Sequence, residues 1–302
     1  MNNMQLIFRA LPRKISYFIE NNLHEYIEEI EEIRIRANKK TIIKYNMNEI
    51  IVDYVTTPMD ILNTLQVLCD NSIYSYQSQI CQGFITILGG HRIGITGSAV
   101  MQNGKVININ YISSLNFRIA KEIKGISNNV LPKIIDNNEI KTTLIVSPPG
   151  YGKTTLLRDL VRNISDNGFT VSLVDERGEI AAMYKGVPQN DVGIRTDVIE
   201  NVTKSIGMKI AVRTMTPQVI VADEIGTTED IDAINYAMCS GVKGIFTAHG
   251  GNIDEMKKNE ILNKLYQQKV LERIIFLEKM GKVGKIYKLD KNMNYFDDEK
   301  VE

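Results

Sequence analysis

The first part of the chain mixes helical and strand-like patterns of apolar residues. Apolar residues recur at helical spacing over residues 15–33, and Pro58 opens a second predicted helix that runs to about residue 70. Period-two alternation, typical of half-buried strands, occurs at residues 33–37, 41–45, 84–88, 92–96 and 106–119. Gly89-Gly90 predicts a hairpin between two of these strands. We therefore expect an α+β domain with an antiparallel sheet.

After about residue 141 the apolar runs become short and continuous. They predict strands at residues 143–147, 170–174, 219–222, 244–248, 273–277 and 284–289, with helices at 130–135, 154–165, 198–208 and 230–239. Continuous apolar strands that alternate with helices are typical of a parallel sheet covered on both faces. The predicted fold class is α/β. A parallel-sheet core occupies residues 126–302, and a smaller α+β domain for assembly or partner docking precedes it at residues 1–125.

Composition narrows the classes of protein to consider. Lys+Arg and Asp+Glu number 36 each, and this zero net charge argues against a general nucleic-acid-binding protein. The 3 cysteines are widely spaced and only 3 histidines are present, which argues against a metal site or a disulfide framework. No apolar run approaches the roughly 20 residues of a membrane helix, and the start of the chain does not resemble a secretory signal. We expect a cytoplasmic protein that reaches a membrane only through other proteins.

A glycine-bearing loop lies between the predicted strand at 143–147 and the predicted helix at 154–165. The residues expected to surround a nucleotide's phosphates are Pro148, Pro149, Gly150, Tyr151, Gly152, Lys153, Thr154 and Thr155. Backbone N–H groups of such a loop and of the helix N-terminus bind phosphate oxygens. Lys153 is predicted to reach the β- and γ-phosphates of ATP, and Thr154 to place its hydroxyl on Mg²⁺.

One position in this loop departs from the usual pattern. Ser147 occupies a place where glycine is usual, and we expect its small side chain to be tolerated. The alternative interpretation, a chance glycine turn, has to explain why a strand precedes the loop and an amphipathic helix follows it.

Two adjacent carboxylates end the apolar run at 219–222. Nucleoside triphosphatases need one carboxylate to organise the metal and a group to orient the attacking water. We predict that Asp223 holds Mg²⁺ through its water shell and that Glu224 is the general base. The alternative is that both residues merely begin a solvated loop.

A second acidic pair, Asp175-Glu176, ends the apolar run at 170–174. The carboxyl ends of parallel strands form the ligand-facing edge of such a sheet. Asp175 or Glu176 is therefore a candidate to assist or replace Glu224 as the water-orienting group. A structural ion pair with Arg177 is the alternative.

Three further side chains are candidates for contact with the γ-phosphate. His249 follows the predicted strand at 244–248 and is expected to sense the γ-phosphate by a hydrogen bond, unless it is an ordinary polar residue at a strand end. Arg195 and Arg213 lie near the acidic strands in the sequence. Each is a candidate to act across a subunit interface on a neighbour's γ-phosphate, with local salt bridges as the alternative.

Taken together, these segments resemble the stage III sporulation protein AA family. The motifs are Ser-Pro-Pro-Gly-Tyr-Gly-Lys-Thr-Thr-Leu-Leu-Arg-Asp (147–159), Asp-Glu-Arg-Gly-Glu-Ile (175–180), Arg-Thr-Met-Thr-Pro-Gln-Val-Ile-Val-Ala-Asp-Glu-Ile-Gly (213–226) and Thr-Ala-His-Gly (247–250). Ile-Arg-Ile-Arg (33–36) and Gly-Gly-His-Arg-Ile-Gly-Ile-Thr-Gly (89–97) extend the resemblance to the first domain. The phosphate loop alone is generic, but the combination is specific.

The resemblance implies a RecA-like ATPase core that uses ATP and Mg²⁺. It also implies a relationship to the hexameric ATPases of type II and type IV secretion and pilus systems, and hence a homo-oligomer, a hexamer by resemblance. Members of the family act in the mother cell of endospore-forming bacteria. They are thought to work at the cytoplasmic face of a membrane channel complex that links mother cell and forespore.

Two other functions remain open at this point. One is a RecA-like motor that depends on nucleic acid, which stimulation of ATP turnover by single-stranded DNA would indicate. The other is an assembly scaffold that binds ATP without hydrolysing it, which tight binding with negligible turnover would indicate. The intact pair Asp223-Glu224 argues against the scaffold.

Overall fold

The computed structural model describes residues 4–290 and 294–297 of the chain. It divides into two compact units, one made of Met1–Lys121 with Ala182–Gln189 and the other of Glu122–Ala181 with Asn190–Glu302. The hydrophobic pattern predicts a boundary at residue 125 and contains no signal that residues 182–189 belong with the first unit.

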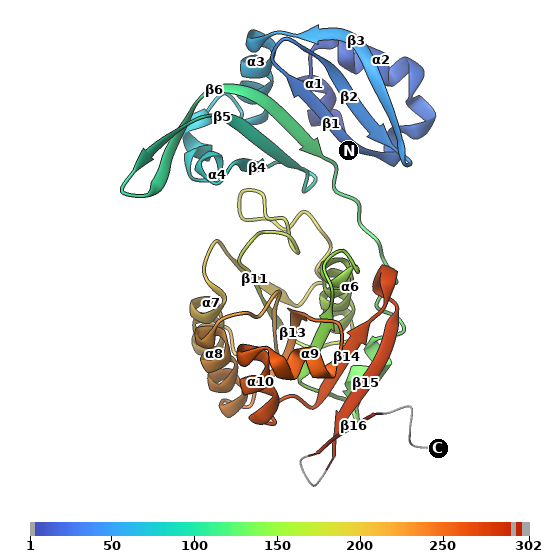
Figure 1. The fold of residues 1–302 in the computed structure, drawn as a ribbon, viewed down its shortest axis with the longest axis vertical. Coiled ribbons are helices and arrows are strands. Elements are labelled where there is room, and N and C mark those ends of the chain that lie inside the picture. Colours follow the sequence, from blue (N-terminus) through green and yellow to red (C-terminus); the bar gives the residue numbers. More distant parts are fainter. Residues whose placement is uncertain (1–3, 291–293, 298–302) are drawn as a thin grey trace. The chain divides into compact units, whose positions relative to one another are not determined.

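The first unit is built on a six-stranded sheet (Figure 1). Its strands are β1 (Ile30–Arg36), β2 (Lys39–Tyr45), β3 (Asn48–Thr56), β4 (Phe84–Thr86), β5 (Arg92–Gln102) and β6 (Lys105–Arg118). They lie in the order β3-β2-β1-β6-β5-β4, and every neighbouring pair is antiparallel. The antiparallel sheet expected from the alternating pattern is therefore present, and β3 is an additional strand that the pattern did not predict.

Helices cover one face of this sheet. They are α1 (Gln5–Ala10), α2 (Arg13–Asn22), α3 (Pro58–Leu68) and α4 (Gln77–Cys81), with 3₁₀ turns η1 (His24–Glu29) and η2 (Ile73–Tyr76). Ile33, Ile35 and Leu115 of the sheet are buried in one cluster with Ile19 of α2 and Leu65 of α3. Of the predicted helix at 15–33, the α-helix ends at residue 22 and residues 24–29 form a 3₁₀ turn. The prediction is wrong over 30–33, because these residues belong to β1 and pair with β2 and β6.

The second unit contains an eight-stranded sheet and a two-stranded ribbon. The strands are β7 (Ile135–Asp136), β8 (Glu139–Ile140), β9 (Thr143–Ser147), β10 (Val171–Asp175), β11 (Thr196–Glu200), β12 (Val219–Ala222), β13 (Lys243–His249), β14 (Arg273–Leu277), β15 (Val283–Leu289) and β16 (Tyr295–Asp297). The sheet order is β11-β10-β12-β13-β9-β14-β15-β16. The first six strands in this order, from β11 at the edge to β14, are mutually parallel. The last two, β15 and β16, are antiparallel.

Helices cover both faces of the parallel strands. They are α5 (Leu131–Ile134), α6 (Lys153–Asp166), α7 (Lys204–Thr214), α8 (Thr228–Cys239), α9 (Ile253–Lys258) and α10 (Glu260–Gln267), with the 3₁₀ turn η3 (Lys279–Gly281). Leu144 and Phe246 pack with α7, α8 and α10 on one face. Ile145 of β9 and Val221 of β12 face the other side of the sheet and are equally buried, as is the apolar side of α6. Because neither face meets water, the strands have no polar alternation.

One predicted helix of this unit is wrong in its first half. The segment predicted as a helix at 198–208 begins as strand β11, and only its second half belongs to α7. Val198 and Ile199 pair with Leu173 and Val174 of β10, so β-branched side chains at the edge of the sheet prevail over helical periodicity.

The topology brings four loops together. Because β9, β10, β12 and β13 are parallel neighbours, the loops that follow them leave the same edge of the sheet. These are the glycine-bearing loop after β9, the Asp-Glu segments after β10 and β12, and the turn after β13.

Candidate active site

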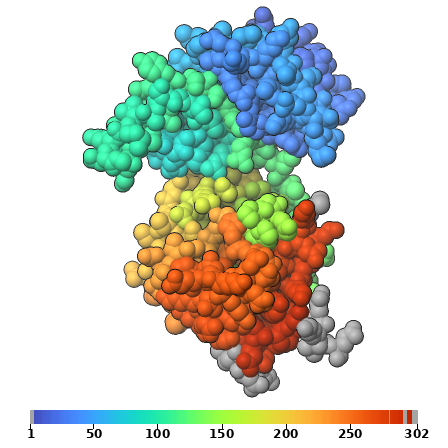
Figure 2. All heavy atoms as spheres, in the orientation of Figure 1, coloured from blue at the N-terminus to red at the C-terminus, as the bar shows by residue number. Residues whose placement is uncertain are grey.

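The loop between β9 and α6 has a backbone that only glycine adopts easily. Gly150 has φ of 76° and Gly152 has φ of 89°, both in the left-handed region. Gly152 is the N-cap of α6, so the free N–H groups of the first helical turn open onto this loop. In Figure 2 the stretch around residue 150 (lime green) lies at the surface of its unit. The loop is thus an accessible glycine-bearing turn at a helix N-terminus, the kind of turn that commonly binds anions.

Ser147 is compatible with this loop. It is the last residue of β9, it is buried, and it is absent from the residues with positive φ. Its hydroxyl donates a hydrogen bond to the carbonyl of Pro148 at 3.0 Å. A Cβ atom is therefore allowed at this position although glycine is usual there.

The side chain of Lys153 lies beneath the loop, where it is almost completely buried. Its ammonium donates to the carbonyl of Ser147 at 2.9 Å and lies 3.1 Å from Nδ1 of His249. Burial lowers the pKa of Lys153, and the carboxylates of Asp223 and Glu224 oppose that shift. An anion bound in the loop would add the negative charge that a buried ammonium needs.

Asp223 lies between two hydroxyl groups. The hydroxyl of Thr154, at the start of α6, donates to one carboxylate oxygen at 2.9 Å. The hydroxyl of Thr247, on β13, donates to the other oxygen. Sequence reasoning did not single out Thr247. Its place in the Thr-Ala-His-Gly motif gave no role for it, because its contact with Asp223 depends on the pairing of β12 with β13.

Glu224 has a left-handed backbone with φ of 54°, which is unusual for a residue other than glycine. Its N–H donates to Thr247 Oγ1 at 2.8 Å. Its carboxylate contacts His249 Nε2 at 3.1 Å and Arg177 at 2.7 Å. With the proton of a neutral His249 on Nε2, that N–H donates to Glu224 while Nδ1 accepts from the Lys153 ammonium. Such strained backbone is often found at functional sites.

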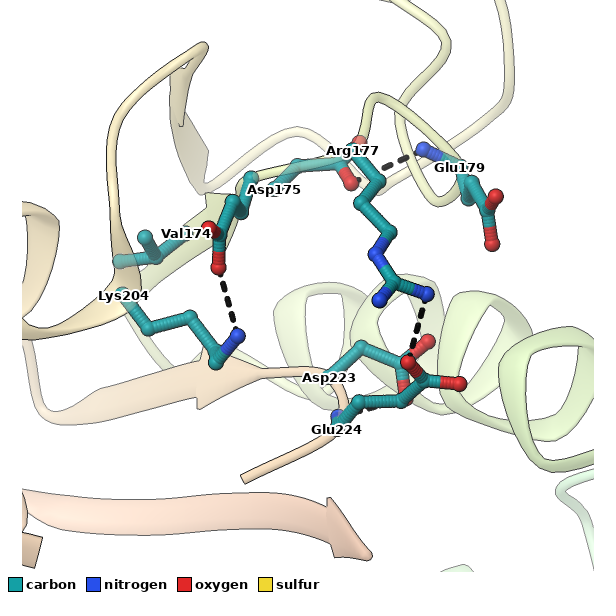
Figure 3. A pocket seen from close by; sticks show the side chains of 8 residues that line it. Val174, Asp175, Arg177, Glu179, Lys204, Asp223 and Glu224 are labelled. Carbon is teal, nitrogen blue, oxygen red and sulfur yellow. Dashed lines mark hydrogen bonds and ion pairs between the residues drawn. The ribbon is translucent and has the colours of Figure 1, made fainter. Parts of the chain in front are cut away.

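The second acidic pair has different partners (Figure 3). Asp175 is buried and accepts hydrogen bonds from the backbone N–H groups of Glu179, Ile180 and Ala181, at 3.0, 3.1 and 2.8 Å. Burial raises the pKa of Asp175, and these hydrogen bonds partly oppose the rise. Glu176 pairs with Lys204 at 2.5 Å. Arg177 pairs across the loop with Glu224, a contact that sequence reasoning did not anticipate.

An open pocket joins the loop to the carboxylate and the histidine. Its lining residues are Pro149, Gly150, Gly152, Lys153, Thr154, Thr155, Glu224 and His249, and its volume is about 380 Å³. That volume falls in the range of small-molecule sites, about 300–1,000 Å³. Pro148 and Tyr151 belong to the loop but not to this lining.

The structure does not bring Arg195 and Arg213 to this pocket. Arg195 directly precedes β11, and Arg213 lies in the last turn of α7, just before β12. Both therefore lie at the amino edge of the parallel strands, on the order of 15 Å from the carboxyl edge. Arg195 contacts the carbonyl of Ser165 at 3.4 Å, and Arg213 lies over the ring of Tyr236. Action on a neighbouring subunit remains a prediction for either arginine.

Comparison with known proteins places the chain in a family. The family model described as "Sporulation stage III, protein AA" matches residues 1–294. The chain belongs to this family. Stage III sporulation protein AA of Bacillus subtilis (strain 168) is 36% identical over 299 residues, covering 96% of this chain and 97% of that protein. The protein SEEDLING PLASTID DEVELOPMENT 1 of Arabidopsis thaliana is 27% identical over 80% of this chain and 33% of its own length.

Solved structures show the fold of this member of the sporulation family. The Legionella pneumophila ATPase DotB superimposes with a TM-score of 0.59 at 13% identity, over 97% of this chain and 83% of DotB. The pilus retraction motor PilT with bound ADP gives 0.58 at 17% identity, over 84% and 76%. The predicted fold class is confirmed. In the described part of the chain, no helix is long and apolar enough to span a membrane.

Proposed function

We propose that this chain binds ATP with Mg²⁺ at the loop Pro148–Thr155 and hydrolyses it to ADP and phosphate. The observation that carries the proposal is the meeting of three elements at one sheet edge. The anion-binding loop, the buried ammonium of Lys153 and the carboxylates of Asp223 and Glu224 line or adjoin one open pocket. Two segments far apart in the sequence, residues 148–155 and 223–224, supply them.

The chain's own groups suit the charges of a nucleoside triphosphate. The N–H groups of the first turn of α6 and the ammonium of Lys153 present positive charge to phosphate oxygens. Lys153 would leave the Ser147 carbonyl for the β- and γ-phosphates, while His249 holds its Nδ1 face toward the same ammonium.

The residues present also fit Mg²⁺. The Thr154 hydroxyl and the Asp223 carboxylate are hard oxygen donors, and they lie 2.9 Å apart. Magnesium is commonly held by one or two such protein groups together with phosphate oxygens and water. When bound, the ion would neutralise phosphate charge that develops during hydrolysis.

Glu224 is the better candidate for orienting the attacking water. Its carboxylate lines the pocket with the phosphate loop, next to His249. Glu176, the alternative, does not line that pocket, and Lys204 occupies its carboxylate. In this proposal Glu224 accepts a hydrogen bond from the water, and His249 keeps the carboxylate in place.

Membership of the sporulation family supports a further step. We propose that the chain assembles into a ring, a hexamer by resemblance, at the cytoplasmic face of a membrane channel complex between mother cell and forespore. The first unit would dock partners, and Arg195 or Arg213 would reach a neighbour's γ-phosphate. Their location at the amino edge leaves them available for a neighbouring subunit rather than their own site.

Steady-state ATP hydrolysis over a protein concentration series tests this proposal. We expect specific turnover to rise with concentration, because the site is proposed to be completed by a neighbour. Lys153→Ala should lose nucleotide binding and turnover, whereas Glu224→Gln should bind ATP and not hydrolyse it. Lys209→Ala removes an exposed lysine of α7 and serves as the matched control.

Other outcomes would favour other functions. ATP binding without turnover at any concentration would favour the scaffold. Turnover that requires single-stranded DNA would favour a nucleic-acid motor. Turnover that survives Glu224→Gln would remove Glu224 from the water-orienting role.

A further inference from the structure

Both oxygens of the Glu224 carboxylate make a contact in this structure. Arg177 contacts Oε2 at 2.7 Å, and His249 Nε2 contacts Oε1 at 3.1 Å. A carboxylate that orients water needs an oxygen free to accept the water's proton. Figure 3 shows the Arg177 side chain reaching from its loop toward Glu224. While this ion pair persists, a water that approaches Oε2 has to share that oxygen with the Arg177 guanidinium.

The turn that carries Arg177 is held from two sides. The buried carboxylate of Asp175 accepts the N–H groups of residues 179–181. Arg158 of α6, the helix that begins at the phosphate loop, donates to the carbonyls of Glu179 and Ile180 at 2.7 and 3.2 Å. Arg177 lies at the tip of this turn, beside Gly178 with φ of 64°. The position of this turn therefore determines whether the Arg177 guanidinium can reach Glu224.

The same stretch of chain continues directly into residues 182–189, which belong to the first unit. Lys185 pairs with Asp70 at 2.6 Å, and the hydroxyl of Tyr184 donates to the same carboxylate at 3.2 Å. Gln189 accepts the N–H of Gly89 at 2.9 Å. One segment of 15 residues, 175–189, is thus anchored at one end to the core that carries the phosphate loop and at the other end to the first unit.

We propose that Arg177 is a positioning residue that withholds Glu224 from water in the resting chain, and that the first unit controls it through residues 182–189. The proposal rests on the function proposed above and adds its regulation. Release of Lys185 from Asp70 lets the segment shift, and Arg177 then leaves Glu224. One carboxylate oxygen becomes free for the attacking water. A partner or neighbouring subunit that engages the first unit at Asp70 would in this way stimulate ATP hydrolysis.

The test compares kcat and KM for Mg-ATP among full-length variants. Arg177→Ala should raise kcat about fivefold with little change in KM. This factor corresponds to the free energy of one partly exposed ion pair, taken as a decrease in the activation free energy. The Arg177 side chain is 66% exposed, so its removal should leave the melting temperature unchanged. Arg177→Lys, which retains the charge, should remain close to wild type. Lys209→Ala controls for the loss of a surface charge in the same unit.

The link to the first unit is tested by Lys185→Ala and Asp70→Asn. Each should raise kcat, as Arg177→Ala does. Combining either with Arg177→Ala should raise kcat no further than Arg177→Ala alone, because both changes act through the same contact. Lys105→Ala, at the exposed start of β6, is the matched control in the first unit. A purely structural role for residues 182–189 would lower the melting temperature and leave kcat unaffected.

The outcomes separate this proposal from the proposed function. A wild-type chain that hydrolyses ATP, with kcat unchanged or reduced in Arg177→Ala, would overturn the withholding role and leave the ATPase proposal in place. Additive effects of Lys185→Ala and Arg177→Ala would overturn control by the first unit. ATP binding without turnover in the wild type, Arg177→Ala and Lys185→Ala alike would overturn both proposals. Turnover that appears only when Arg177 is removed would support both.

Discussion

The two acidic strand ends of the core look alike in the sequence and differ in the structure. Asp175-Glu176 follows β10 and Asp223-Glu224 follows β12, and these strands are parallel neighbours. After β10, the aspartate is buried under its own loop and the glutamate pairs with Lys204. After β12, the aspartate meets hydroxyls from α6 and β13, and the glutamate lines the pocket.

The difference shows that a carboxylate's role depends on the groups that face it. Asp175 accepts three N–H groups of the following turn, so it organises backbone. Asp223 faces the hydroxyl groups of Thr154 and Thr247, which leaves it beside the phosphate loop. Both glutamates are ion-paired, Glu176 with Lys204 and Glu224 with Arg177, but only Glu224 lines the open pocket. Asp175 therefore holds the turn that carries Arg177, while Glu224 lines the pocket at which we propose ATP binding.

The largest expected difference between the pairs is in hydrolysis. Glu224→Gln should lower kcat by about 10²- to 10³-fold, and Glu176→Gln by about twofold at most, because only Glu224 lines the phosphate pocket. Steady-state turnover of the two variants measures this, with ATP affinity as the control for folding. Equal losses, or a larger loss for Glu176→Gln, would erase the distinction and assign the water-orienting role to the β10 pair.

The next largest difference is in stability, and here the larger effect is expected at the β10 pair. Asp175→Ala leaves three buried N–H groups without an acceptor and should lower the free energy of unfolding by about 2–4 kcal/mol. Asp223 is partly exposed, so water can enter the space that its carboxylate leaves, and Asp223→Ala should lower it by about 1 kcal/mol or less. Chemical denaturation measures both values. A greater loss of stability for Asp223→Ala would contradict the structural role given to Asp175.

The smallest expected effect is the pH dependence of stability at Asp175. Burial raises its folded-state pKa above the unfolded value, so the native chain binds the proton more readily in the window between the two. The contribution of Asp175 to stability is therefore greatest below the unfolded pKa, about 4, and declines as pH rises through the folded pKa. Denaturation of the wild type and Asp175→Asn over this range should show a difference that falls with rising pH. A difference that grows with pH would mean that the three hydrogen bonds outweigh burial.

Local patterns predicted much of the fold and part of the site. The glycine-bearing turn between β9 and α6 was predictable because strand, glycines and helix are consecutive, and the place of each acidic pair because it directly follows a short apolar run. The segment at 198–208 was mispredicted because its valine and isoleucine satisfy helical spacing and strand propensity equally well. Pairing with β10 decided between the two.

The sequence by itself determined which residues follow the ends of the strands at the candidate site, because strand, turn and helix signals are local. Only the tertiary structure decided what those residues face. Thr247 meets Asp223 because β12 and β13 are neighbours, and Arg177 meets Glu224 because β10 and β12 are neighbours. The order of strands in a sheet depends on long-range packing of side chains from the whole unit. For that reason the partners of the carboxylates, and the attachment of residues 182–189 to the first unit, could not be read from any local pattern.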